Sequence, residues 1–188
     1  MSEARGVAVL GATGSIGGST LKVIGRHPDR FRVTSLSAGQ RAADLGRLAT
    51  VWNPDYVVRA APSDGSMGEG WGGEWRYGSE AMKEAAADPG APIVVNALVG
   101  VAGLESTLVA LEAGKRLALA NKESLVAGGD LVLDAVSAGG GELLPVDSEH
   151  SAIRQCLGDR PTAEVNRVIL TASGGPFRDW PAERFGSI

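Results

Sequence analysis

Near its start the chain reads Val7-Ala8-Val9-Leu10-Gly11-Ala12-Thr13-Gly14-Ser15-Ile16-Gly17, and this stretch decides the fold. The apolar run 7–10 predicts a buried strand, and residues 17–26 have the spacing of a helix. A glycine-rich turn between a strand and a helix lets backbone N–H groups reach a pyrophosphate, and the helix start adds a partial positive charge. Because the spacing is G-x-x-G-x-x-G rather than G-x-G-x-x-G, the position of the turn, more than its motif, predicts dinucleotide binding. The alternative is a tight strand–helix turn that binds nothing.

Further along, short apolar runs alternate with segments of helical spacing. The expected strands are 7–10, 31–36, 56–58, 93–97, 117–120, 143–146 and 168–171, and the expected helices are 17–26, 41–52, 102–113, 122–138 and 148–156. In one helix Leu45, Leu48 and Trp52 recur at three- and four-residue intervals, as one buried face requires. The alternation predicts an α/β fold, a Rossmann-like, doubly wound, mainly parallel sheet. We expect the dinucleotide-binding domain over residues 1–140 and the start of a second α/β domain over 141–188.

Residues 60–78 depart from this alternation. They include Pro62, Trp71 and Trp75 among several glycines and show no clear period. We interpret the stretch as an irregular excursion whose two indole rings fold back on the body of the protein. The alternative is a contact with a partner or a lipid through those rings.

The composition excludes several classes of protein. The net charge of −4 over 188 residues gives no basic stripe for nucleic acid. No apolar run reaches membrane-spanning length and no signal or transit segment precedes the first strand, so we expect a cytoplasmic, bacterial protein. The single cysteine, Cys156, allows neither a disulfide framework nor a zinc cage within the chain. We expect it to be a buried structural thiol rather than a nucleophile.

The end of the second expected strand indicates which dinucleotide binds. The stretch Ser35-Leu36-Ser37-Ala38-Gly39-Gln40-Arg41 contains no Asp or Glu, which an NAD site uses to hold the ribose 2′-hydroxyl. The guanidinium of Arg41 can instead pair with a 2′-phosphate. The pattern favours NADP(H), and the alternative is that Arg41 is an ordinary surface residue at a helix start.

Three later loops follow expected strands at the edge where open α/β sheets bind ligands. In the first, Asn121 and Lys122 can hold a ribose, a carbonyl oxygen or a phosphate. The same residues could simply cap a helix. In the last, the stretch Ala172-Ser173-Gly174-Gly175 offers hydroxyl and backbone donors to an anionic substrate, although any chain leaving a sheet could use such a turn.

The middle loop, Asp147-Ser148-Glu149-His150, carries two carboxylates at positions i and i+2. If the backbone is extended, both point to one side, and such hard oxygen ligands suit Mg²⁺ or Mn²⁺. The alternative has Asp147 as a helix N-cap and Glu149 in the first helical turn. His150 alone is more typical of a packing or hydrogen-bonding residue than of a ligand.

Four stretches are distinctive when taken together. They are Gly11-Ala12-Thr13-Gly14-Ser15-Ile16-Gly17, Ala120-Asn121-Lys122-Glu123-Ser124-Leu125-Val126, Leu144-Pro145-Val146-Asp147-Ser148-Glu149-His150-Ser151-Ala152-Ile153 and Ser173-Gly174-Gly175-Pro176-Phe177-Arg178. In this order they resemble the 1-deoxy-D-xylulose 5-phosphate reductoisomerase family, and the second and third are the most specific. The stretch Asn96-Ala97-Leu98-Val99-Gly100 also resembles the family's cofactor-contacting strand end.

The resemblance implies an NADPH-dependent, Mn²⁺- or Mg²⁺-dependent oxidoreductase of non-mevalonate isoprenoid biosynthesis. Such an enzyme rearranges the phosphorylated sugar 1-deoxy-D-xylulose 5-phosphate and reduces the aldehyde intermediate to 2-C-methyl-D-erythritol 4-phosphate. By resemblance the metal ligands are Asp147 and Glu149, the substrate contacts are Lys122, Ser148, Glu149 and Ser173, and Lys122 and Glu149 are catalytic. The implied cofactor contacts are Thr13, Gly14, Ser15, Ile16, Gly39, Gln40, Arg41, Asn121 and Glu123.

The chain departs from the family pattern in two respects. Gln40 stands where members often have a basic residue, so a 2′-phosphate would depend more on Arg41. A third metal carboxylate, a tryptophan-bearing lid and a cluster for the substrate phosphate are expected beyond Ile188, so we expect the 188 residues to be inactive alone. The family's homodimer forms largely through later segments, which leaves the oligomeric state open.

Two other functions stay open at this point. One is an NADP(H)-binding module with no chemistry of its own. The other is a different NADP-dependent dehydrogenase, such as homoserine or aspartate-semialdehyde dehydrogenase, although the semialdehyde enzyme needs a reactive cysteine.

Overall fold

The computed structural model describes residues 3–61, 70–169 and 179–187. The chain divides into two compact units, Met1–Ser151 and Ala152–Ile188, and each is described by itself. Within the described residues no helix has the length and apolar character needed to cross a membrane.

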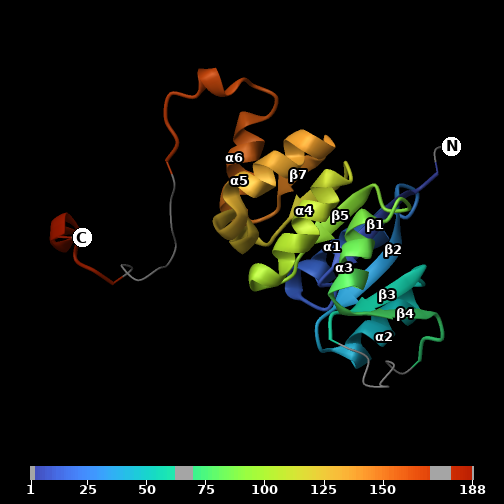
Figure 1. Ribbon diagram of the computed structural model, residues 1–188. Coiled ribbons are helices and arrows are strands. Elements are labelled where there is room, and N and C mark those ends of the chain that lie inside the picture. Colours follow the sequence, from blue (N-terminus) through green and yellow to red (C-terminus); the bar gives the residue numbers. More distant parts are fainter. Residues whose placement is uncertain (1–2, 62–69, 170–178, 188) are drawn as a thin grey trace. The chain divides into compact units, whose positions relative to one another are not determined.

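The first unit is built on a seven-stranded sheet in which every pairing is parallel (Figure 1). The strands are β1 (Arg5–Leu10), β2 (Phe31–Ala38), β3 (Tyr56–Arg59), β4 (Glu74–Tyr77), β5 (Ile93–Asn96), β6 (Arg116–Leu119) and β7 (Glu142–Pro145). Their order in the sheet is β4-β3-β2-β1-β5-β6-β7. The chain therefore builds outward from β1 in one direction and then from β5 in the other, so the junction of β1 and β5 is the topological switch point of the sheet.

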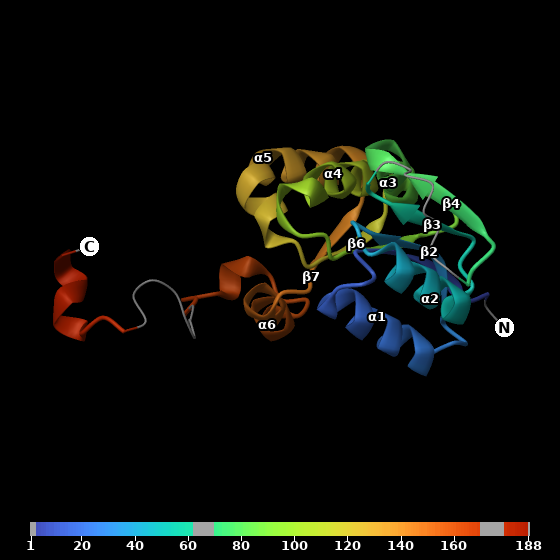
Figure 2. The same cartoon turned by 90° about the horizontal axis from the view of Figure 1, so that it is seen from below.

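Helices cover both faces of this sheet, as Figure 2 shows. The helices α1 (Ser15–Arg26) and α2 (Ala42–Trp52) lie on one face, and α3 (Gly78–Ala87), α4 (Leu104–Glu112) and α5 (Lys122–Gly139) lie on the other. Val7 and Val9 pack with α1 and α2, whereas Ala8 and Leu10 pack in the opposite core. Both faces of β1 are buried, which is why its sequence is a continuous apolar run. The predicted Rossmann-like, doubly wound fold is confirmed.

Most of the expected elements are confirmed, and two were not expected. The strand β4 arises within the stretch 60–78, where the sequence suggested only an irregular excursion, and the helix α3 follows it, where no element was expected. The two indole rings of that excursion do fold back on the protein: Trp71 and Trp75 meet edge to face, with ring centroids 6.3 Å apart, and pack against the α1–α2 core. Residues 62–69 of the excursion lie outside the described residues.

The second unit contains most of α6 (Ser148–Leu157) and the short 3-10 helices η2 (Thr162–Glu164) and η3 (Ala182–Ser187). The prediction of a strand over residues 168–171 is wrong for the two residues that are described, because Val168 and Ile169 are not in a strand. The other two residues lie outside the described part. The compact units divide after Ser151, whereas the expected domain boundary at 140/141 stays a prediction.

Candidate functional site

Apart from Ser173, the predicted site residues lie on loops that leave the carboxyl edge of the sheet. Leu10 pairs with Asn96, Asn96 with Leu119, and Leu119 with Pro145, so β1, β5, β6 and β7 end in register. The loops after these strands therefore start side by side, beginning at the switch point between β1 and β5. In an open α/β sheet this is where ligands bind.

The glycine loop after β1 is shaped by close backbone approaches. Gly11 has φ +84°, and a Cβ atom there would lie 2.6 Å from the carbonyl oxygen of Ala97. A Cβ atom on Gly17 would lie 2.5 Å from the carbonyl oxygen of Gly11. Both approaches exclude any side chain, so these glycines hold the loop against the residues that follow β5 and α1 against the loop.

The start of α1 offers backbone donors at the sheet edge. Gly14 occupies the N-cap position and has no side chain that could accept a hydrogen bond, and the first helical bond runs from Gly18 N–H to the Gly14 carbonyl at 2.9 Å. The N–H groups of Ser15, Ile16 and Gly17 precede that bond, so they have no partner within the helix. The side chains of Ser15 and Ile16 are exposed. An anion placed here would meet several donors and the positive end of the helix.

A serine of β2 anchors this loop, which the sequence did not predict. Ser37 is fully buried. Its hydroxyl oxygen accepts the Gly11 N–H at 3.0 Å, and its carbonyl oxygen accepts the Ala12 N–H at 2.8 Å. The sequence signal for this role was weak, because β2 contains two other hydroxyl residues, Thr34 and Ser35.

The residues expected at a 2′-phosphate follow β2. Gly39, Gln40 and Arg41 are all exposed, and Arg41 is the N-cap residue of α2. Arg41 forms no ion pair with any residue that the structure describes. The nearby carboxylate of Asp44 pairs with Arg47 instead. The guanidinium of Arg41 is thus available to an anion at the same sheet edge.

The side chain of Asn121 is used within the protein. It caps α5 and is 2% exposed, so the helix-cap alternative is confirmed for this residue. Its side-chain oxygen accepts hydrogen bonds from the backbone N–H and the hydroxyl of Ser124, both at 2.8 Å. Its amide nitrogen donates to the carbonyl oxygens of Leu98 and Gly100 at 2.7 and 2.6 Å. The carboxamide has no remaining capacity for a ligand, whereas Lys122 and Glu123 are exposed beside it.

The acidic loop after β7 is helical rather than extended. Asp147 caps α6 by accepting the backbone N–H of His150 at 3.0 Å, and Nδ1 of His150 lies 2.7 Å from the same oxygen. Ser148 and Glu149 are exposed in the first turn of α6. The premise of an extended backbone is therefore wrong, and the N-cap alternative for Asp147 is confirmed.

Capping α6 does not prevent Asp147 from also binding a metal ion. Partial burial raises the pKa of its carboxyl, but hydrogen bonds from His150 lower it, and the result lies below the ordinary value. The carboxylate is thus ionised at neutral pH and keeps a second oxygen. Among the described residues, however, no group of three His, Cys, Asp or Glu side chains is placed to hold a metal ion.

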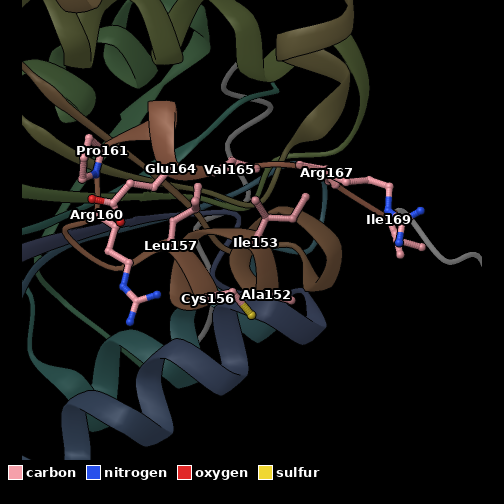
Figure 3. A pocket seen from close by; sticks show the side chains of 11 residues that line it. Ala152, Ile153, Cys156, Leu157, Arg160, Pro161, Glu164, Val165, Arg167 and Ile169 are labelled. Carbon is pink, nitrogen blue, oxygen red and sulfur yellow. The ribbon is translucent and has the colours of Figure 1, made fainter.

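The second unit has a cavity of about 430 Å³ that contains none of the predicted site residues (Figure 3). Its lining includes Ile153, Cys156 and Leu157 of α6 and Val165 of the segment that follows. Cys156 shares the apolar side of α6 as expected, but the expectation of a buried thiol is wrong, because the residue is exposed. Ser173 lies outside the described residues.

Two family models match the chain. The model of 1-deoxy-D-xylulose 5-phosphate reductoisomerase matches residues 7–129, and the model of the C-terminal domain of 1-deoxy-D-xylulose 5-phosphate reductoisomerase matches residues 143–188.

Known proteins agree with these matches. A 1-deoxy-D-xylulose 5-phosphate reductoisomerase of Acidithiobacillus ferrooxidans is 47% identical over an alignment of 195 residues. The alignment covers 100% of this chain and 49% of the relative. The structure of the Zymomonas mobilis reductoisomerase in complex with NADPH has a TM-score of 0.84 at 45% identity, covering 98% of this chain and 50% of that one. A DOX-P reductoisomerase in complex with magnesium also gives 0.84, at 38% identity and the same coverage. The chain spans about half the length of the curated relatives it matches.

Proposed function

Because the chain belongs to the 1-deoxy-D-xylulose 5-phosphate reductoisomerase family, we propose that its residues bind NADPH and supply two ligands of a catalytic metal site. The observation that carries the proposal is the pairing of two features at one sheet edge. The donors at the start of α1 suit a pyrophosphate, and the acid-free end of β2 presents Arg41 to a 2′-phosphate. The Zymomonas mobilis relative, whose structure contains NADPH, supports this assignment.

The same geometry supports the proposed cofactor contacts. Thr13, Gly14, Ser15 and Ile16 line the pyrophosphate, and Gly39, Gln40 and Arg41 surround the 2′-phosphate. Glu123 lies at the other side of the switch point, where it can hydrogen-bond a ribose hydroxyl. The side chain of Asn121 is fully used within the protein, which leaves its backbone for the cofactor contact that the family resemblance implies.

For the metal, Asp147 and Glu149 provide hard oxygen ligands after β7, which fits Mg²⁺ or Mn²⁺. A relative that contains magnesium supports the choice. A bound divalent cation polarises a carbonyl oxygen of the substrate. Lys122 donates to an oxygen of the same substrate, and Ser148 and Ser173 hold it through their hydroxyl groups. The reaction proposed for the whole enzyme is the rearrangement of 1-deoxy-D-xylulose 5-phosphate, followed by reduction to 2-C-methyl-D-erythritol 4-phosphate.

We also propose that the cofactor-binding domain spans residues 1–140 and that the catalytic domain begins at 141. The first family model ends at residue 129 and the second starts at residue 143, which supports a boundary between them. In this arrangement β7 and the acidic loop after it belong to the catalytic domain by their place in the sequence. In space, β7 pairs with β6 and completes the sheet of the cofactor domain.

The reaction can be tested by joining residues 1–188 to the unmatched half of the Acidithiobacillus ferrooxidans relative. We expect this fusion to consume NADPH, followed at 340 nm, only when both Mn²⁺ and 1-deoxy-D-xylulose 5-phosphate are present. The 188 residues alone should bind NADPH without turnover, because their described part supplies too few metal ligands. A fusion that binds NADPH and Mn²⁺ but leaves the sugar phosphate unchanged would contradict the proposed reaction.

The metal role of Asp147 can be separated from its capping role. Asparagine caps helices about as well as aspartate, so we expect Asp147→Asn to change the free energy of unfolding by less than about 1 kcal/mol. The substitution removes the charge, and Mn²⁺ binding by the fusion, measured by water-proton relaxation, should be lost. The matched control is Asp130→Asn on the exposed side of α5, which should bind Mn²⁺ as the wild type does. Equal Mn²⁺ binding by Asp147→Asn and the wild type would leave Asp147 only as a helix cap.

A further inference from the structure

Ser37 lies near the end of β2, where the adenosine side of the proposed cofactor site begins. It is 0% exposed, and it precedes the exposed turn 39–41 by two residues. A buried hydroxyl group is costly unless it forms a hydrogen bond, so the partner of Ser37 indicates what this side chain holds in place.

That partner is the glycine loop after β1. The hydroxyl oxygen of Ser37 accepts the Gly11 N–H at 3.0 Å, and the carbonyl oxygen of Ser37 accepts the Ala12 N–H at 2.8 Å. One residue of β2 therefore binds two consecutive peptide groups of the loop. Only the first of these bonds depends on the side chain.

An irregularity in the sheet separates Ser37 from another hydroxyl residue of the same strand. The register between β1 and β2 shifts by one residue after Val7, which leaves Thr34 without a partner residue in β1. Thr34 is also fully buried, but its hydroxyl has no hydrogen-bond partner within the part of the chain that the structure describes. The two buried hydroxyl groups thus differ in one respect, since Ser37 holds the loop and Thr34 does not.

The opposite side of the loop is held without Ser37. The Ala97 N–H donates to the Leu10 carbonyl at 2.8 Å, and a Cβ atom on Gly11 would lie 2.6 Å from the carbonyl oxygen of Ala97. The loop therefore lies between β2 and the residues that follow β5. Removing the Ser37 hydroxyl loosens only the side that faces β2.

On the basis of the proposed function, we propose that Ser37 is a positioning residue that sets the spacing between the two phosphate contacts of NADPH. The pyrophosphate meets the donors at the start of α1, directly after the loop, and the 2′-phosphate meets Arg41, four residues after Ser37. By bonding the loop to the strand that leads to Arg41, the Ser37 hydroxyl fixes one contact relative to the other. NADPH makes both contacts at once, so its affinity depends on a spacing that is set before it binds.

NADH separates this role from a general effect on the loop. It has a hydroxyl in place of the 2′-phosphate, so it makes the pyrophosphate contact alone and can follow a small shift of the loop. A change of spacing therefore weakens NADPH binding more than NADH binding, whereas damage to the loop itself weakens both equally.

The test uses two variants of similar shape that differ in the hydroxyl. Ser37→Thr keeps it, and Ser37→Val has a methyl group in its place. In fluorescence titrations we expect Ser37→Val to weaken NADPH binding by about five- to tenfold and NADH binding by less than about twofold, because the Gly11 N–H loses its acceptor. Ser37→Thr should restore most of the preference for NADPH. Hydrogen exchange at the Gly11 amide should be faster in Ser37→Val than in Ser37→Thr.

The matched control is Thr34→Val, which removes a buried hydroxyl from the same strand without removing a hydrogen bond to the described residues. Both affinities should stay as in the wild type. If the larger side chains at position 37 prevent folding, Ser37→Ala removes the hydroxyl without adding volume, and it should narrow the preference for NADPH in the same way.

The outcomes are distinct. Equal losses for NADPH and NADH, or equal NADPH affinities in Ser37→Val and Ser37→Thr, would overturn the positioning role. Unchanged NADPH affinity in a folded Ser37→Ala variant with faster exchange at Gly11 would overturn it as well. A wild-type chain that binds neither nucleotide would remove this role together with the proposed function, and that result is visible before any variant is made.

Discussion

Replacing Gly17 by alanine is expected to weaken NADPH binding by about a hundredfold, because two charge-assisted hydrogen bonds of about 1.5 kcal/mol each would be lost. The added Cβ would lie 2.5 Å from the Gly11 carbonyl oxygen and 2.6 Å from the Cα of Ala12. Both neighbours are backbone atoms, so either α1 or the glycine loop must move. In either case the donors at the start of α1 leave their positions.

The adjacent glycine provides a matched control. A Cβ on Gly18 would meet nothing within 4 Å, and Gly18 lies inside α1. Gly18→Ala should therefore stabilise the protein by about 0.5–1 kcal/mol and leave NADPH affinity unchanged. Gly17→Ala should destabilise it by about 1–3 kcal/mol, measured by urea denaturation. If the two variants bind NADPH equally well, the close approach of α1 to the loop has no part in cofactor binding.

The second large effect is expected at Arg41. Replacing it by alanine should weaken NADPH binding by about ten- to hundredfold, since one charged hydrogen-bonding partner of a phosphate contributes about 1.5–3 kcal/mol. Affinity for NADH should be unchanged, because NADH has a hydroxyl where NADPH has the 2′-phosphate. Fluorescence titration of both nucleotides against wild type and variant measures the change in preference directly.

Two companion variants define the contact at Arg41. Arg41→Lys keeps the charge but loses the planar, two-pronged geometry, so it should show an intermediate preference. Arg47 lies six residues further along, in α2, where it is exposed and pairs with Asp44, so Arg47→Ala should behave as the wild type. A loss of NADH affinity equal to that of NADPH in Arg41→Ala would show that Arg41 supports the fold of the loop and not the 2′-phosphate.

The sequence predicted the centre of the sheet better than its edge. The strands β1 and β5 are buried on both faces, so their apolar runs stand out in the sequence. The strand β4 is an edge strand with the mixed sequence Glu-Trp-Arg-Tyr and no fully buried residue, so no such run marks it. The helix α3 buries mainly small alanines, and their periodicity is hidden in an alanine-rich stretch.

The sequence predicted those site residues whose role follows from their place directly after a particular strand. The glycine loop and Arg41 follow the first and second strands, and the order of elements places them at one edge. The partners of Asn121 could not be predicted, because they are backbone carbonyls of the segment 97–103 that only the folded chain brings near. The anchor at Ser37 has the same origin, since it depends on the pairing of β1 with β2. For Asp147 the sequence allowed a cap or a metal ligand, and the structure shows a cap that still has a free oxygen.

The measurement that tests the account most directly is a titration of the wild-type chain with NADPH and with NADH, following nicotinamide fluorescence, with circular dichroism as proof of folding. We predict saturable binding of NADPH and at least about tenfold weaker binding of NADH, the difference expected for one charged contact to the 2′-phosphate. A folded chain that binds neither nucleotide, or binds both equally, would contradict the assignment of the glycine loop and Arg41 as an NADPH site.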